Sequence, residues 1–254
     1  MLRNYKLEIM YDGSRYKGWE HQPGTDMTIQ GKLENVLKRM TDPDDTLPED
    51  KVPEVIGAGR TDAGVHARAM IANVRLDTSL SENGIRDYMN EYLPDDICVT
   101  DVRTASDRFH SRYNATGKTY RYTCFTGGLK PVFDRKYVYV LDGEPDLDKM
   151  RKAASLLVGE HDFASFCSNP KMKKSTVRRL DRIDIEKKGR YIYFTYHGSG
   201  FLQHMVRILT GTILETGFGL RSPESMSALL EARERAQAGF TAPPQGLCLM
   251  KVDY

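Results

Sequence analysis

The amino-acid sequence predicts an α+β fold made of two halves with mostly antiparallel sheets. Helix-like and strand-like segments occur in similar proportion in each half of the 254 residues, which is typical of this class. Hydrophobic residues make up 40% of the chain and charged residues 28%, as in ordinary globular proteins. The chain is long enough for two units that each bury a core. We predict that they span residues 1–105 and 106–254.

In the first half, strands and helices alternate. Tyr5–Tyr11 alternates apolar and polar residues as a strand does. Thr28 and Ser81 are suitable N-caps, and the apolar residues that follow recur at helical spacing to about Met40 and Tyr92. Further strands are predicted at 53–56, 69–76 and 97–102.

In the second half the same elements recur. Val177–Glu186 and Tyr191–His197 are predicted to form a hairpin around Lys187–Gly189. Further strands are predicted at 118–125, 137–141 and 247–253. Helices are predicted at 147–158, 202–216 and 223–231.

The segment Gly57–Ala67, with the sequence GAGRTDAGVHA, is the most informative part of the chain. It follows a predicted strand and places one aspartate among glycines, which allow tight turns and close approach of a substrate. A dinucleotide-binding turn requires glycines at relative positions one, three and six. Gly57 and Gly59 fit that pattern, but the sixth position is Asp62, whose charge would oppose a pyrophosphate. The sequence therefore indicates an exposed reactive carboxylate.

Motifs in this order resemble those of the tRNA pseudouridine synthase A family. Besides GAGRTDAGVHA they are YDGSRYKGW at 11–19, QG at 30–31, KTYRY at 118–122, HDF at 161–163, FLQHMVR at 201–207 and APPQGL at 242–247. The resemblance thus covers most of the chain. Two positions depart from the family pattern: Glu20 stands where glutamine is expected, and Cys248 where an aromatic residue is more usual.

The resemblance implies two ferredoxin-like halves whose sheets join around a central catalytic cleft. It implies an isomerase that converts uridine to pseudouridine in the anticodon stem-loop of tRNA, working as a homodimer with one RNA in contact with both subunits. The reaction breaks the N1–C1′ bond of uridine and joins C5 to C1′ without a redox change. We therefore expect no cofactor and no metal.

Such a reaction needs one ionised carboxylate near the sugar and the base, and Asp62 is the candidate. Whether Asp62 attacks the sugar or the base, or acts as a base, stays open. By resemblance Arg207 pairs with Asp62 and favours its ionised form. Tyr120 would stack on the target uracil, and Gly59, Thr61, Gly64 and His66 would support the loop.

RNA contacts are expected from basic side chains on two stretches of the chain. The candidates are Lys118, Arg121, Lys173, Lys174 and Arg178. Arg60 is a further candidate, either inserted in the RNA stack to hold the target nucleotide out or in contact with a phosphate.

Other classes of function are less consistent with the sequence. Neither a signal-peptide core nor a run of ~18 apolar residues is found, and the four cysteines form no CxxC pair, so we expect a cytoplasmic protein. The alternatives are a synthase acting on another structured RNA, and an RNA-binding or RNA-folding module without turnover. A metal-dependent hydrolase built on His66, His161 and Asp162 is a more remote alternative.

Overall fold

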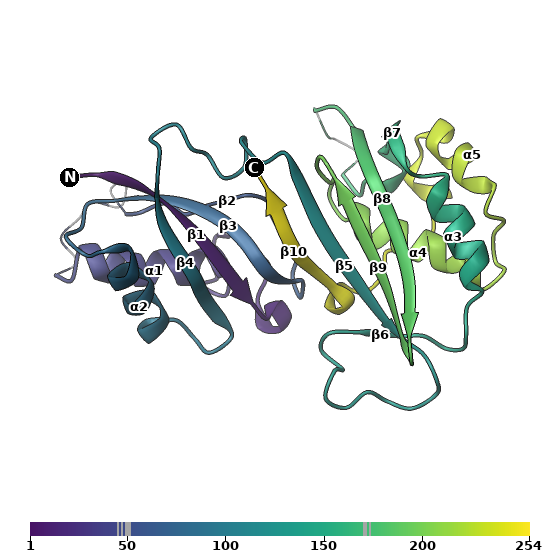
Figure 1. Ribbon diagram of the computed structural model, residues 1–254, viewed down its shortest axis with the longest axis horizontal. Helices are drawn as coiled ribbons and strands as arrows, with labels where there is room; N and C mark the ends of the chain where they lie inside the picture. The colour runs from purple at the N-terminus through teal and green to yellow at the C-terminus, as the bar shows by residue number, and fades with distance from the viewer. Residues whose placement is uncertain (45, 47, 49–51, 170–171, 173) are drawn as a thin grey trace. The chain divides into compact units, whose positions relative to one another are not determined.

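The computed structural model describes residues 1–44, 46, 48, 52–169, 172 and 174–254. Its internal contacts define two compact units (Figure 1), one formed by Met1–Thr116 with Leu249–Tyr254 and the other by Gly117–Cys248. The halves predicted from the sequence, 1–105 and 106–254, stay a prediction about domain organisation.

The sheet of the first unit has a ferredoxin-like strand order. Its strands are β1 (Arg3–Tyr11), β2 (Ile56–Gly57), β3 (His66–Leu76) and β4 (Ile97–Ala105). β1 lies between β4 and β3, and β2 pairs with β3, with antiparallel pairing throughout these strands. In chain order this is fourth, first, third, second, as in the βαββαβ fold.

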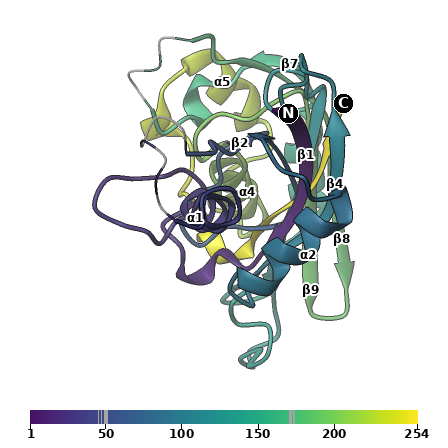
Figure 2. The same cartoon turned by 90° about the vertical axis from the view of Figure 1, so that its left-hand side faces the viewer.

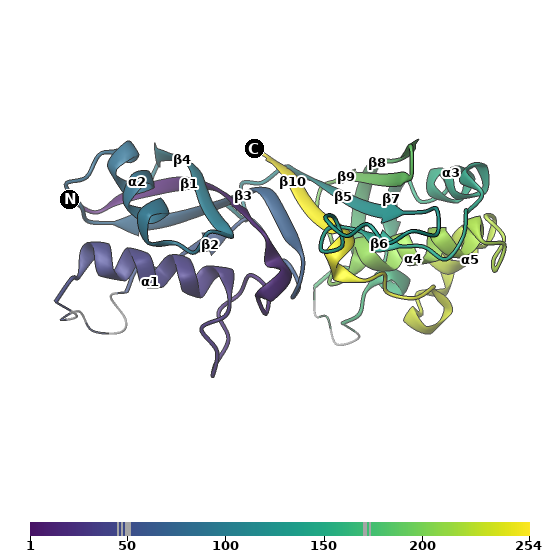
Figure 3. The same cartoon turned by 90° about the horizontal axis from the view of Figure 1, so that it is seen from below.

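Two helices connect these strands, α1 (Ile29–Thr41) and α2 (Glu82–Tyr92). The hydroxyls of Thr28 and Ser81 each accept a hydrogen bond of 3.1 Å from a backbone N–H in the first turn, so both predicted caps are present. The two helices contact one another. α1 lies to the left of β1 in Figure 2 and below β1 and β3 in Figure 3.

Buried polar contacts attach the segment after β4 and the C-terminus to the first unit. The side-chain oxygen of Asn73 accepts from the backbone N–H of Ser111 at 2.8 Å, and its amide donates to Asn4 Oδ1 at 3.2 Å. The hydroxyl of Tyr254 donates to Ser111 O at 2.7 Å. A satisfied network of this kind holds one backbone geometry, which explains why the last residues belong with the first unit.

The second unit contains β5 (Gly117–Phe125), β7 (Gly159–Asp162), β8 (Val177–Lys188) and β9 (Tyr191–Gly198). They lie in the order β5-β9-β8-β7 with antiparallel pairing, and the short β6 (Tyr139–Val140) pairs with the end of β5 in the parallel direction. β9 therefore separates β5 from β8, as the third strand of a ferredoxin-like half separates the first from the second. β7 extends this sheet beyond β8.

Three helices cover the second sheet: α3 (Leu147–Ser155), α4 (Met205–Gly217) and α5 (Ser225–Ala232). α3 packs on α4 and β8, and α4 contacts β5. Figure 3 shows α4 and α5 below β5 and β9. Nearly every residue of α4 is buried, so this helix is the centre of the second core.

Four short 3-10 helices and one strand complete the described part of the chain. They are η1 (Gly13–Arg15), η3 (Ala164–Phe166), η4 (Arg235–Gln237), η5 (Pro244–Gly246) and β10 (Leu247–Asp253). No helix in the described part of the chain has the length and apolar character needed to cross a bilayer.

The predicted fold class, α+β with ferredoxin-like halves and mostly antiparallel sheets, is confirmed. Some predicted boundaries are wrong. α4 begins at Met205 and not at Leu202, because His204 adopts a left-handed φ of 59°. The strand predicted at 53–56 is reduced to Ile56–Gly57, and β7 was not predicted.

Candidate active site

Asp62 lies at the start of a tight turn between β2 and β3. The backbone N–H of Val65 donates to Asp62 O at 3.1 Å, and Gly64 has a φ of 78° at the third position. That combination is a type II turn, which requires a positive φ at this position and therefore favours glycine. Asp62 itself is half-buried. The turn presents the carboxylate on backbone of fixed geometry.

Thr61 anchors the turn on one side. Its hydroxyl is 2.8 Å from the hydroxyl of Tyr11, and its carbonyl accepts from the backbone N–H of Trp19 at 3.0 Å. Gly18, with a φ of 107°, permits this approach, since a Cβ there would be 2.8 Å from Thr61 O. Tyr11, Trp19 and Thr61 are all buried. The residue before Asp62 is thus held by the Tyr11–Trp19 segment.

His66 anchors the turn on its other side. Its Nδ1 lies 3.1 Å from the backbone nitrogen of Gly13 and 3.2 Å from Asp12 Oδ1. His66 is 5% exposed, and a Cβ on Gly13 would be 2.0 Å from Val65 O. The η1 helix therefore packs directly on the Asp62 turn.

Asp96 fixes η1 through its contacts with Arg15 and Tyr16. Arg15 forms an ion pair with Asp96, and the hydroxyl of Tyr16 donates to Asp96 Oδ1 at 2.5 Å. Burial would raise the pKa of Asp96, but the hydrogen bonds from Arg15 and Tyr16 outweigh it and hold this pKa below its usual range. Burial and the same hydrogen bond raise the pKa of Tyr16 to about 12. Sequence reasoning missed Asp96, because 81 residues separate it from Arg15.

Arg60 lies in the loop before the turn and is exposed, whereas its neighbour Gly59 is half-buried. Its guanidinium forms an ion pair with Glu20, and the two side chains are 59% and 45% exposed. Glu20, one of the two residues that depart from the family pattern, is therefore the ion-pair partner of Arg60, the candidate RNA-contacting arginine.

Tyr120 lies in β5, opposite Tyr196 of β9. The ring of Phe201 meets its ring edge-on, with centroids 5.1 Å apart and an interplanar angle of 81°. Edge-to-face contacts of this kind fix ring orientation. Tyr120 is 7% exposed, as expected for a residue on the core side of a strand.

Lys118 and Arg121 do not share a sheet face. Side chains alternate along a strand, so Lys118 lies on the face of Tyr120 and Arg121 on the opposite face. The guanidinium of Arg121 lies 5.5 Å from the ring centroid of Tyr193 on that opposite face. The structure thus does not bring Arg121 to the side of β5 that carries Tyr120.

Arg207 lies in the first turn of α4 and is tied to the segment before β10. Its Nε donates to Ala242 O at 2.7 Å, and the backbone N–H of Ala242 donates to Arg207 O at 3.1 Å. This pair of contacts sets the direction of the guanidinium.

Tyr122 is a supporting residue that sequence reasoning did not single out. It is fully buried, its hydroxyl donates to Pro243 O at 2.7 Å, and a Cβ on Gly246 would be 2.7 Å from its ring. Burial raises the pKa of Tyr122, while the charge of Arg207 acts in the opposite direction. The sequence could have indicated Tyr122, because it lies two residues after Tyr120 and therefore on the same face of β5.

The structure describes only part of the second basic stretch, which contains Lys173, Lys174 and Arg178. Lys174 is exposed, and Arg178 donates from Nη1 to Ser175 O and Val177 O at 2.8 and 2.6 Å. Burial lowers the pKa of Arg178. Lys173 lies outside the described residues.

The side chains considered for a metal site have other partners. His161 Nε2 lies 3.1 Å from Val158 O, and Asp162 Oδ1 accepts from Ala164 N at 3.1 Å. His66 accepts from η1, in the other unit. Across the described ranges, no group of three or more His, Cys, Asp and Glu side chains is arranged to hold a metal ion.

The candidate groups therefore belong to two sets, each within one unit. Arg60, Thr61, Asp62, Gly64 and His66 lie on one anchored loop of the first unit, and Tyr120 and Arg207 lie in the second. One carboxylate on a tight turn, a strand tyrosine and an anchored arginine are the groups that the sequence analysis assigned to an enzyme.

Comparison with known proteins identifies the family. Residues 9–114 and 153–254 match the family model described as tRNA pseudouridine synthase. The tRNA pseudouridine synthase A of Bacillus sp. strain KSM-64 is 43% identical over 253 residues, covering both chains completely. The protein of the same name from Geobacter sp. strain M21 is 42% identical over 254 residues, 100% of this chain and 99% of its own. The tRNA pseudouridine synthase A 2 of Bacillus anthracis is 39% identical over 253 residues, again over both whole chains.

The chain belongs to the tRNA pseudouridine synthase family, whose members isomerise uridine to pseudouridine in tRNA. The family and the isomerase activity predicted from the sequence are thereby confirmed.

Proposed function

We propose that this synthase modifies uridines in the anticodon stem-loop of tRNA and that Asp62 supplies the reacting carboxylate. The anchored turn supports the role of Asp62, and the anticodon stem-loop follows from the family resemblance. Thr61 and His66 are held by buried hydrogen bonds to the Tyr11–Trp19 segment, so the carboxylate between them is presented on rigid backbone. Catalytic groups are most effective when their backbone is fixed before the substrate binds.

The reaction balances without a co-reactant. The N1–C1′ bond of uridine breaks and a C5–C1′ bond forms, N1 gains a proton, and the C5 proton passes to solvent. The ionised Asp62 carboxylate attacks the sugar or the base, or acts as a base, and it is regenerated when the new bond has formed.

On the family resemblance we infer that Arg207 pairs with Asp62 and that Tyr120 stacks on the uracil. The contact of Arg207 Nε with Ala242 O supports a fixed direction for the guanidinium. The edge contact of Phe201 supports a fixed plane for the Tyr120 ring. An ion pair with Arg207 would keep the carboxylate in its reactive, ionised form.

Arg60 would enter the RNA after leaving Glu20. An exposed ion pair contributes only about 0–1 kcal/mol, so its exchange for a contact with RNA costs little. A base within a stack must be turned out before an enzyme can reach it, and an inserted arginine can occupy the space it leaves. Lys118, Lys173, Lys174 and Arg178 would contact phosphates, and affinity should fall with salt. Arg121 would do so on the face of β5 opposite Tyr120.

On the family resemblance we also propose that the enzyme is a cytoplasmic homodimer in which one tRNA contacts both subunits. Sedimentation of the free protein and of its tRNA complex would measure both stoichiometries.

The experiment that tests the proposed reaction uses unmodified tRNA carrying tritium at uridine C5. Wild-type protein should release tritium to water, and the Asp62→Ala and Asp62→Asn variants should not, although they bind tRNA with similar affinity. Equal release by the variants would remove Asp62 from its role. Tight binding with no release by the wild type would favour the RNA-binding module. Release from another structured RNA but not from tRNA would favour the other synthase.

A further inference from the structure

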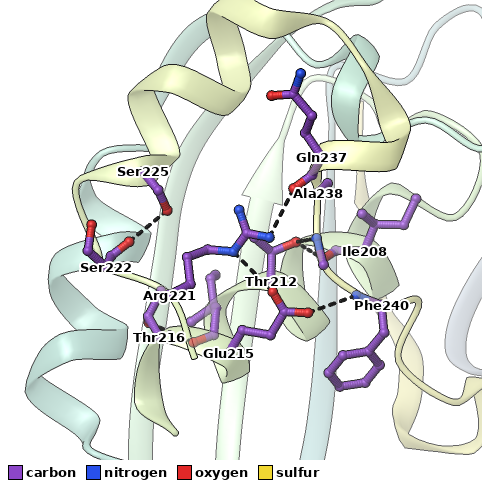
Figure 4. Close-up of polar contacts among 12 residues, drawn as sticks. Ile208, Thr212, Glu215, Thr216, Arg221, Ser222, Ser225, Gln237, Ala238 and Phe240 are labelled. Atoms are coloured by element: carbon purple, nitrogen blue, oxygen red, sulfur yellow. Dashed lines mark hydrogen bonds and ion pairs between the residues drawn. The ribbon is translucent and has the colours of Figure 1, made fainter. Parts of the chain in front are cut away.

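The segment Gly239–Ala242 packs against one face of α4 and ends at Ala242, the hydrogen-bond partner of Arg207. Arg207, Gly211 and Glu215 are spaced by four residues, so they share a face of the helix. Figure 4 shows Phe240 beside Glu215. The segment Gly239–Ala242 follows α4, since the backbone N–H groups of Gly239, Phe240 and Ala242 all donate to residues of this helix. Each of its described contacts lies within the second unit.

Glu215 fixes the middle of this segment. Its Oε1 accepts from the backbone N–H of Phe240 at 3.2 Å, and its Oε2 accepts from Arg221 Nε at 3.0 Å. The side chains of Glu215 and Arg221 are 19% and 20% exposed, and Arg221 Nη2 also donates to Gln237 O at 2.9 Å. Hydrogen bonds to an ionised carboxylate are stronger than neutral ones, and more so where solvent is partly excluded.

The segment has little room to move against the helix. Thr212 Oγ1 accepts from the backbone N–H of Gly239 at 3.0 Å (Figure 4). A Cβ on Gly211 would lie 1.9 Å from Phe240 O, and a Cβ on Gly239 would lie 2.7 Å from the Glu215 carboxylate. Backbone packed this closely transmits a displacement to its neighbours.

The segment ends at Ala242, whose carbonyl accepts from Arg207 Nε at 2.7 Å. Only Thr241 separates Phe240 from Ala242, so a shift at the Glu215 contact reaches the acceptor of Arg207 through a short piece of chain.

We propose that Glu215 is a positioning residue that orients the guanidinium of Arg207 through the Gly239–Ala242 segment. This inference rests on the proposed function, because it assigns Glu215 a role only if Arg207 takes part in the reaction. Glu215 touches neither substrate nor reacting atoms in this role.

The first test compares two variants that both break the ion pair. In Glu215→Gln the amide presents one acceptor and one donor, so it cannot accept from both Phe240 N and Arg221. Arg221→Met leaves the contact between Glu215 and Phe240 in place. We expect Glu215→Gln to slow single-turnover tritium release about 10- to 100-fold, the scale of a small misplacement of a catalytic group. Arg221→Met should lower the melting temperature similarly but keep the rate within about threefold.

The second test is a double-mutant cycle with Arg207→Lys, which lacks the Nε–H that Ala242 accepts. If Glu215 acts through Arg207, Glu215→Gln should cause little further slowing in the Arg207→Lys background, and tRNA affinity should be unchanged in all variants. Independent, multiplicative losses would overturn the inference, and so would equal slowing by Glu215→Gln and Arg221→Met. A full rate for Arg207→Lys alone would show that a positive charge suffices at this position and would overturn the inference about Glu215. Failure of the wild type to release tritium would instead overturn the proposed function, so the two failures are distinguishable.

Discussion

Arg207 and Ala242 exchange two hydrogen bonds, one from Arg207 Nε to Ala242 O at 2.7 Å and one from Ala242 N to Arg207 O at 3.1 Å. A side chain of α4 and the chain before β10 therefore define each other's position. Because Nε is used in this way, the outer part of the guanidinium has a set direction. A lysine has the same charge but not the planar fork that makes such a direction possible.

Arg207→Lys should consequently lower kcat about 100- to 1000-fold, a loss typical of removing one oriented electrostatic group. KM for tRNA should change little, since the lysine keeps the charge. Steady-state tritium release measures both constants. Arg86→Lys, at an arginine of α2 paired with the neighbouring Asp87, is the control and should behave as wild type. An unchanged kcat for Arg207→Lys would show that charge alone suffices.

Glu20→Gln should strengthen tRNA binding, because it frees Arg60 from its ion pair and removes a negative charge near the RNA path. We expect Kd to fall roughly two- to fivefold at low salt, consistent with the small energy of an exposed pair. The gain should shrink as salt is raised, since screening weakens the contribution of the removed charge. Filter binding over a salt series makes this measurement.

Glu186→Gln is a matched control for this change, since Glu186 forms an exposed ion pair with Lys188 at the hairpin of the second unit. It changes net charge equally and should leave Kd nearly unaltered. Equal gains from the two variants would attribute the effect to net charge and not to Arg60.

Gly13→Ala should damage both stability and activity, because the new Cβ would lie 2.0 Å from Val65 O in the Asp62 turn. The obstacle is backbone, so the turn or η1 must move. We expect the free energy of unfolding to fall by roughly 1–3 kcal/mol, the usual cost of overpacking, together with a loss of kcat. Denaturant titration and tritium release measure the two effects.

Gly84→Ala is the comparison, since its Cβ would meet its nearest neighbour, Ser81 Oγ, at 3.4 Å, an ordinary contact. In helix α2 this change should raise stability by about 0.5–1 kcal/mol. Full activity in Gly13→Ala would show that the contact of η1 with the turn is dispensable.

Elements with local signals could be predicted from the sequence. Thr28 and Ser81 cap their helices as expected, and the last strand has the predicted bounds Leu247–Asp253. The start of α4 could not be predicted, because the apolar spacing continues through His204 while its φ of 59° does not allow a helix there. Periodicity reports which side chains can be buried, but it does not report a single residue in the left-handed region.

Contacts between residues far apart along the chain could not be predicted from the sequence. The pairing of Asp96 with Arg15 has no local pattern, and Asp96 could equally have been a solvated residue of a loop. The orientation of Arg121 is a different case, since strand alternation already places it opposite Tyr120. The KTYRY motif suggested Arg121 as an RNA contact, although alternation along the strand already placed its side chain on the face opposite Tyr120.

The support of η1 by Asp96 predicts a pH-dependent contribution to stability. Hydrogen bonds from Arg15 and Tyr16 hold the pKa of Asp96 below its usual range against the effect of burial. A depressed native pKa means that the ionised carboxylate stabilises the fold above the unfolded pKa of about 3.9, and that this stability is lost as pH falls through the native pKa. Asp96→Asn should therefore lower the melting temperature by roughly 2–4 °C at neutral pH, allowing for solvent screening of the pair.

The difference between wild type and Asp96→Asn should narrow as the pH is lowered below about 4, because the wild-type carboxylate is then protonated as well. Asp95→Asn, at the exposed neighbour, should show no such convergence. Melting curves of the three proteins between neutral and acid pH make the comparison. A constant difference across this range would mean that Asp96 supports η1 through its shape and not through its charge.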